Sequence, residues 1–90
     1  MAKVTLNVQY CGGWGYKRYC NALAVAVADE FGDDVEVIGQ RDAGVTGNFN
    51  VVLAQTGELI FSKAKYGGRC ETDEQRSVVF AKIREYLEKA

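Results

Sequence analysis

Polar and apolar side chains alternate strictly at the start of the chain, and this alternation constrains the fold more than any other feature. Apolar side chains occupy every second position from Val4 to Tyr10, so a strand over residues 3–10 would have one apolar and one polar face. Residues 49–53 repeat this pattern. A strand with one polar face belongs to a sheet that is covered on one side. The sequence therefore predicts two layers, with all helices on the same face of the sheet.

The period of the apolar residues then changes to three and four, which predicts two helices. The first runs from Tyr16 to Phe31 and is ended by Gly32. The second begins after Thr72, which forms a capping-box pattern with Gln75. The expected buried stripes of the two helices are Tyr16, Cys20, Leu23, Val27 and Phe31, and Val79, Ile83 and Leu87 with Tyr86 beside them.

Further strands are predicted between the helices, over residues 35–38, 49–53 and 58–63. Residues 39–47 and 66–71 are interpreted as loops. A right-handed crossover makes the second strand parallel to the first, and a hairpin at the end of an antiparallel third strand makes the fourth parallel as well. The predicted fold class is α/β, a two-layer α+β sandwich with a four-stranded mixed sheet. In this topology Cys11 and the segments 45–47 and 67–70 share one edge.

The composition excludes several classes of function. The chain has 90 residues, which is the size of a single domain covering residues 1–90, and its net charge of −1 gives no reason to expect a nucleic acid or a membrane as partner. It has three cysteines and no histidine, so a disulfide scaffold, a metal site and a histidine base are not expected. No signal peptide or membrane span is apparent. We expect a monomer in the reducing cytoplasm.

The stretch YCGGWGYK places Cys11 between the end of a strand and the start of a helix. Free N–H groups and the helix dipole would stabilise a thiolate there, with Lys17 and Arg18 adding positive charge. Gly12 and Gly13 would allow a substrate sulfur to approach the backbone. The alternative is that Cys11 is a small residue in a tight turn. A phosphate loop is not supported, because its Gly-Lys-Ser/Thr ending is absent.

This stretch resembles the signature of the selenoprotein W family, Cys-Gly-x-selenocysteine-Gly-Tyr. The resemblance continues through Asp29-Glu30-Phe31, Thr46-Gly47-x-Phe49 and the run from Gly57 to Lys63, and so covers nearly the whole chain. It implies a thioredoxin-like βαβββα fold. It also implies a cytosolic, antioxidant, glutathione-linked redox protein that binds no cofactor tightly, uses glutathione as co-substrate and has 14-3-3 adaptor proteins as partners.

The chain departs from the family at Trp14, where members carry selenocysteine or cysteine. Indole cannot form a disulfide or selenenylsulfide. Selenocysteine is encoded by UGA, one base from the tryptophan codon UGG, so Trp14 could stand where the gene specifies selenocysteine. The alternative is a genuine tryptophan in a member that has lost its second redox centre. We favour the first interpretation.

Other residues receive weaker assignments. Thr46 and Gly47 occupy the place where thioredoxins have a cis-proline, so they are candidate substrate-binding residues, and we expect a trans peptide at Thr46. Cys20 lies on the apolar stripe and is interpreted as a core thiol. Cys70 is expected on the Cys11 edge as a possible resolving thiol or a bystander. Tyr10, Tyr16 and Tyr66 could line that edge as an apolar collar for a partner, with core packing as the alternative for Tyr10 and Tyr16.

Two functional hypotheses follow from these residues. The first is a thioredoxin-like oxidoreductase in which Cys11 exchanges with client thiols and is reduced by glutathione or thioredoxin. The group at position 14 would supply its second redox centre, and with Trp14 only one-thiol chemistry remains. The second is a non-catalytic interaction module that uses the edge around Cys11 and Trp14.

Overall fold

The computed structural model describes residues 3–13 and 15–89, so Trp14 lies outside the described residues. Its elements have the predicted order of strand, helix, strand, strand, strand, helix, with two short helical segments added. They are β1 (Val4–Tyr10), α1 (Tyr16–Phe31), the 3-10 segment η1 (Gly32–Asp34), β2 (Val35–Arg41), β3 (Phe49–Leu53), β4 (Glu58–Ser62), α2 (Lys63–Tyr66) and α3 (Asp73–Lys89). This arrangement confirms the predicted α/β class and is consistent with a thioredoxin-like fold.

The four strands form one mixed sheet in the order β2-β1-β3-β4. β1 pairs in parallel with β2 and antiparallel with β3, and β4 is antiparallel to β3. The side chains of Val4, Leu6 and Val8 are fully buried, whereas the residues between them are partly exposed. The alternation read in the sequence therefore marks a covered and an open face, as predicted.

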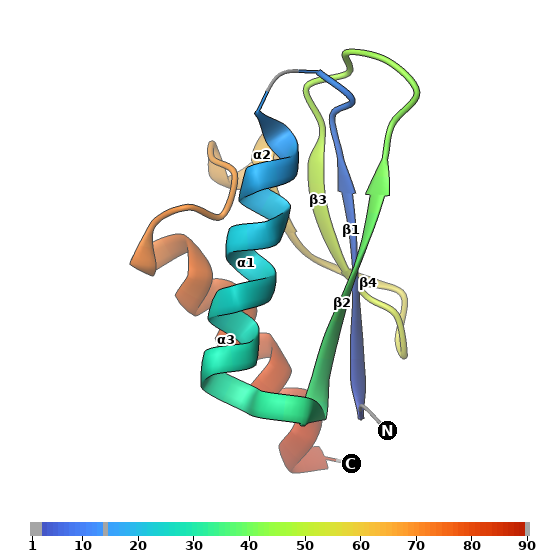
Figure 1. Cartoon of the computed structure of the whole chain (residues 1–90). Helices are drawn as coiled ribbons and strands as arrows, with labels where there is room; N and C mark the ends of the chain where they lie inside the picture. The colour runs from blue at the N-terminus through green and yellow to red at the C-terminus, as the bar shows by residue number, and fades with distance from the viewer. Residues whose placement is uncertain (1–2, 14, 90) are drawn as a thin grey trace.

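Both long helices cover the same face of the sheet (Figure 1). The rings of Phe31 in α1 and Phe80 in α3 make an edge-to-face contact with centroids 5.6 Å apart. Arg84 and Glu30 form an ion pair across the same two helices. The core between the layers combines the apolar face of the sheet with Leu23 and Val27 of α1 and Val79 and Ile83 of α3.

The helix ends follow the sequence signals, with one difference in the capping box. Gly32, at φ 61°, ends α1 as predicted. The Thr72 hydroxyl accepts a hydrogen bond from the N–H of Gln75 at 3.1 Å. The Gln75 side chain, however, accepts from the N–H of Glu71 at 3.1 Å, not from that of Thr72. It thereby fills the space where Gly68 would carry a side chain.

The second strand is longer than predicted, because β2 continues through Gly39 to Arg41. It pairs in register with β1 along its whole length, up to Arg41 opposite Tyr10. A Cβ on Gly39 would lie 3.1 Å from the sulfur of Cys20 and 3.1 Å from the ring of Tyr10. Gly39 therefore marks a close approach of α1 to the strand, not the loop that the sequence indicated.

The segment after β4 also differs from the prediction, because the strand ends at Ser62 and a short helix follows. The Ser62 hydroxyl accepts from the N–H of Lys65 at 3.1 Å and caps α2. Gly67, at φ 79°, ends it. The loop predicted over residues 66–71 consequently begins after Tyr66.

The sheet topology brings several segments together at one end, here called the Cys11 end. β1, β2 and β4 finish there and β3 begins there, so residues 11–13, the loop 42–48 and α2 are neighbours (Figure 1). No peptide bond among the described residues is cis, which confirms the trans peptide expected at Thr46. Within those residues, no helix has the length and apolar character needed to cross a membrane.

Candidate functional site

Cys11 is the first residue after β1, and its backbone is fastened to the loop that leads into β3. Its N–H donates to the carbonyl of Asn48 at 2.8 Å, and the N–H of Gly12 donates to the carbonyl of Gly44 at 3.0 Å. The antiparallel pairing of β1 and β3 makes these bonds possible, because it places the start of β3 beside the end of β1. The structure thus brings Cys11 close to Thr46 and Gly47, which are far from it in the sequence.

The sulfur of Cys11 is surrounded by hydrogen-bond donors that favour its thiolate. The pKa of Cys11 is lowered, chiefly by the backbone N–H of Gly47, with further contributions from the N–H of Gly13 and from the N–H and hydroxyl of Thr46. The Gly13 nitrogen lies 3.2 Å from the sulfur. Burial opposes this effect and raises the pKa. A thiolate was expected from the sequence, but Lys17 and Arg18 are not among the causes of the shift.

The thiol is nearly covered, whereas the loop beside it is open. Cys11 is 2% exposed and Val45 is 85% exposed. A Cβ on Gly13 would lie 3.1 Å from a methyl of Val45 and 3.3 Å from the Cys11 sulfur. An external sulfur can reach Cys11 only where the segments around the thiol separate.

Gly12 was expected to leave room for a substrate sulfur, but its surroundings show a packing role. A Cβ at this position would collide with the carbonyl oxygen of Asp42 and lie 2.8 Å from that of Gly44. The space freed by glycine is therefore filled by the protein's own loop, and Gly12 is required by packing of that loop. Its assignment as a substrate-binding residue stays a prediction, as do those of Gly13, Thr46 and Gly47.

Asp42 organises the loop and was not identified from the sequence. Its carboxylate accepts from the Thr46 hydroxyl at 2.5 Å, from the Gln9 amide at 2.8 Å and from the Asn48 amide at 3.2 Å. These bonds, that of Thr46 first, lower the pKa of Asp42. The signal available in the sequence was an aspartate followed within six residues by Thr46 and Asn48, the composition of a side-chain-capped turn.

Cys70 lies in the loop that follows α2, and its thiol is buried in the core. The residue is 1% exposed and adopts φ 56°, which is uncommon for a residue with a side chain. Burial raises the pKa of its thiol to about 12. Such a thiol is a poor nucleophile at neutral pH. The proposed resolving role stays a prediction, and all three cysteines are free in this structure.

The remaining candidate residues are mostly part of the core. Cys20 is buried and burial raises its pKa, which confirms the expected core thiol. Tyr10 packs in the core at 7% exposure. The ring of Tyr66 stacks on Phe61 with centroids 5.1 Å apart. The assignment of position 14 falls on a residue outside the described part of the chain. Within that part, no group of three or more Cys, Asp or Glu side chains could hold a metal ion.

The fold and this site define a class of protein: a small two-layer α/β domain with a cysteine thiol of lowered pKa directly after its first strand. The chain matches the Rdx family over residues 5–84 and belongs to that family. It is 33% identical to selenoprotein W of Ovis aries over 97% of this chain and 98% of the relative. Selenoprotein W of Macaca mulatta is 33% identical over 93% and 94%, and that of Danio rerio 29% identical over 96% and 98%. Membership of this family supports a redox-related function.

Proposed function

We infer that the chain is a glutathione-linked thiol redox protein whose reactive group is the sulfur of Cys11. The observation that carries this proposal is the set of donors around that sulfur. The N–H groups of Gly47 and Gly13 and the hydroxyl of Thr46 stabilise the thiolate, which is the nucleophilic form of cysteine. Family membership supports the same chemistry.

The proposed reaction is thiol–disulfide exchange. The Cys11 thiolate attacks one sulfur of a disulfide, the S–S bond breaks, and one half leaves as a thiolate that takes a proton from water. The product is a mixed disulfide between Cys11 and the other half. A glutathione thiolate then attacks the sulfur of that other half, which restores Cys11 as a thiolate and releases a new disulfide. Each cycle consumes one glutathione, and when the other half is itself glutathione the disulfide released is glutathione disulfide. This cycle would give the protein its antioxidant role.

Position 14 decides whether the cycle has one or two redox centres on the protein. We propose that the gene specifies selenocysteine here, which would close a selenenylsulfide with Cys11. With Trp14 the mixed disulfide is resolved by an external thiol. Sequencing the codon for residue 14 tests this directly, since UGA supports the proposal and UGG overturns it.

The proposed surroundings follow from the same chemistry. A cysteine that cycles through the thiol form requires a reducing compartment, so we propose the cytoplasm, with glutathione or thioredoxin as reductants and protein thiols as clients. We also propose 14-3-3 proteins as partners. Binding of purified 14-3-3 to the full chain, measured with Cys11 free and with Cys11 glutathionylated, tests that pairing.

The function is tested by glutathione disulfide at neutral pH. We expect one glutathione per chain, attached to Cys11 in peptide maps and removed by reduced glutathione. Cys20 and Cys70 provide internal controls, because their pKa values are raised whereas that of Cys11 is lowered. A Cys11→Ser variant that is modified as fast as the native chain would overturn the proposal.

A second candidate, a non-catalytic interaction module, is favoured by one observation. Val45, at 85% exposure, presents an apolar side chain beside the Cys11 turn. Partner binding that survives Cys11→Ser but is lost in Val45→Asp would support this module. Loss of binding in Cys11→Ser alone would support the redox function instead.

A further inference from the structure

A hollow of about 200 Å³ lies at the Cys11 end, next to the residue that contributes most to thiolate stability. It is lined by Gly47, Asn48, Phe49 and Asn50 on one side and by Lys63 and Ala64 of α2 on the other. Gly47 thus faces both the sulfur of Cys11 and this hollow. A molecule whose sulfur reaches Cys11 can place a neighbouring group here.

Lys63 supplies the charge of the hollow. Its Nζ donates to the hydroxyl of Tyr16 at 3.1 Å and would lie 3.9 Å from a Cβ on Gly47. The ammonium is also 5.7 Å from the centre of the Tyr16 ring. None of the salt bridges among residues 3–13 and 15–89 involves Lys63. Its ammonium is held by the Tyr16 hydroxyl, and no carboxylate of the described residues pairs with it.

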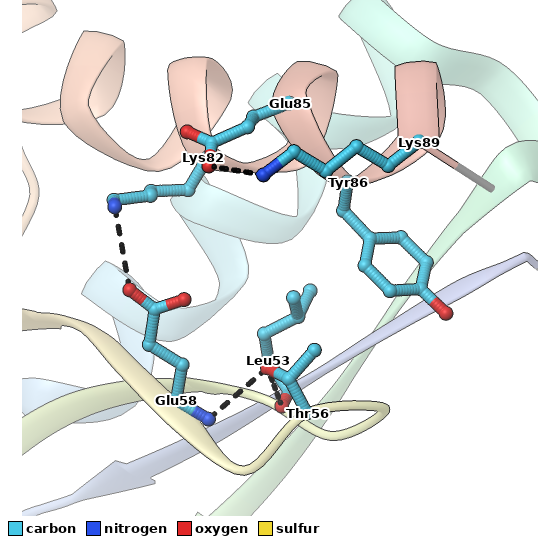
Figure 2. Close-up of a pocket in the computed structure, with 7 residues that line it drawn as sticks. All are labelled: Leu53, Thr56, Glu58, Lys82, Glu85, Tyr86 and Lys89. Atoms are coloured by element: carbon cyan, nitrogen blue, oxygen red, sulfur yellow. Dashed lines mark hydrogen bonds and ion pairs between the residues drawn. The ribbon is translucent and has the colours of Figure 1, made fainter.

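A hollow at the opposite end of β4 shows the contrasting case. Figure 2 shows its two lysines turned toward carboxylates, with Lys82 3.3 Å from Glu58 and Lys89 3.1 Å from Glu85. These charges are already paired within the protein. The hollow beside Lys63 has no carboxylate among its lining residues.

Unpaired positive charge is found over the whole Cys11 end, not only at Lys63. Most of the lysines and arginines that form no salt bridge lie at this end. Among the described residues, the two such cations that lie elsewhere are Lys3 and Arg76. The group at the Cys11 end comprises Lys17, Arg18, Arg41, Lys63 and Lys65. Of the acids nearby, Asp42 is held by three donors of its own loop and Glu71 pairs with Arg69 at 3.2 Å. The chain carries a net charge of −1, yet this end is locally positive, which attracts anionic substrates.

We propose that the hollow between Gly47 and Lys63 is a subsite for a carboxylate of the disulfide substrate. The inference rests on the proposed redox function and narrows it to small peptide disulfides with free carboxylates. Lys63 is the specificity-determining residue. The exchange step is unchanged: the Cys11 thiolate forms a bond to one substrate sulfur, and the other half leaves as a thiolate.

The experiment compares three small disulfides of different charge. Glutathione disulfide is negative, hydroxyethyl disulfide is neutral and cystamine is positive. The rate of mixed-disulfide formation at Cys11 is measured by mass spectrometry at low and high salt, and divided by the rate for the same chain unfolded in urea. Variants are Lys63→Gln and Lys63→Glu. Lys65→Gln is the matched control, because Lys65 lies in the same helix with its Nζ over the Tyr66 ring.

We expect Lys63→Gln to slow the reaction with glutathione disulfide about threefold and Lys63→Glu about tenfold at low salt, with both effects reduced by salt. Lys63→Glu should accelerate the reaction with cystamine. Neither variant should change the rate with hydroxyethyl disulfide, and an unchanged rate also shows that the site is intact. Lys65→Gln should change each rate less than twofold. Equal effects of Lys63→Gln and Lys65→Gln on glutathione disulfide would overturn the subsite and leave the redox function standing. Failure of all three disulfides to modify Cys11 would overturn both.

Discussion

The carbonyl oxygen of Asp42 occupies the space in which a side chain on Gly12 would begin. The loop 42–48 is therefore packed directly against the backbone that follows Cys11. The same loop supplies the N–H of Gly47, the main cause of the lowered Cys11 pKa. Packing at Gly12 and thiol chemistry at Cys11 thus depend on one loop position.

We expect Gly12→Ala to lower the free energy of unfolding by about 1–3 kcal/mol, because the added methyl forces the backbone of Asp42 and Gly44 away. The Cys11 pKa should rise in the same variant as Gly47 moves off. Urea unfolding and alkylation kinetics measure the two effects. Gly44→Ala is the control, since a Cβ there meets nothing within 4 Å. Equal stability of the two variants would contradict the packing role of Gly12.

The lowered pKa of Cys11 predicts a reactive thiol at neutral pH. The midpoint of its alkylation rate against pH should lie below the free-cysteine value of about 8.5. Thr46→Val removes a hydroxyl that donates to Asp42 and contributes to the lowered pKa of Cys11, so the midpoint should rise and alkylation at pH 7 should slow. Val45→Ala, an exposed change in the same loop, should leave the midpoint unchanged. A native midpoint at or above 8.5 would rule out activation.

Cys70 predicts a loss of stability in alkaline solution. Its pKa is raised by burial from 9.0 to about 12, so the folded protein retains a proton that the unfolded chain releases. The contribution of the Cys70 thiol to the free energy of unfolding is fully present below pH 9. It is lost as the pH rises toward 12, at about 1.4 kcal/mol per pH unit.

In Cys70→Ala this component should vanish, so that its free energy of unfolding falls less steeply between pH 9 and 11 than that of the native chain. Urea unfolding at fixed pH steps measures both slopes. The comparison is within each variant, so a constant cost of alanine at φ 56° does not affect it. Parallel curves for the two chains would show that the thiol is not buried as described.

Trp14→Cys should create a dithiol that closes reversibly with Cys11. The expected result is the loss of two free thiols on mild oxidation, recovered with glutathione. Trp14→Ser is the matched control and should lose none under the same conditions. A Trp14→Cys chain that stays reduced while ordinary dithiols oxidise would disprove the inferred Cys-x-x-Cys geometry.

Periodicity and end signals predicted most of the fold. Val4–Tyr10 and Tyr16–Phe31 have the predicted character because one face of each is buried, and burial is what the pattern records. Gly39 misled the prediction of β2, since a glycine required by a neighbouring sulfur looks the same in sequence as a glycine in a turn.

The site was predicted less completely than the fold. Cys11 was identified because its reactive type and its place after a strand are local features. The dependence of its sulfur on Gly47 follows from strand order, which the topology rules supplied. The three bonds of Asp42 depend on side-chain positions within a loop, and no period in the sequence encodes them. Lys63 was also not identified from the sequence, because its position is set by a hydrogen bond to Tyr16, which is distant in the sequence.

The central place of β1 has a consequence for synthesis on the ribosome. Of the four strands of this sheet β1 is made first, and both of its partners come later, with β2 starting at Val35 and β3 at Phe49. The strands on both sides of β1 are therefore complete only when Leu53 has left the exit tunnel. The helix α3, which packs on β4 and α1, is made after both of them. A nascent chain arrested before Leu53 should be digested by protease, and one extended past Lys89 should resist it.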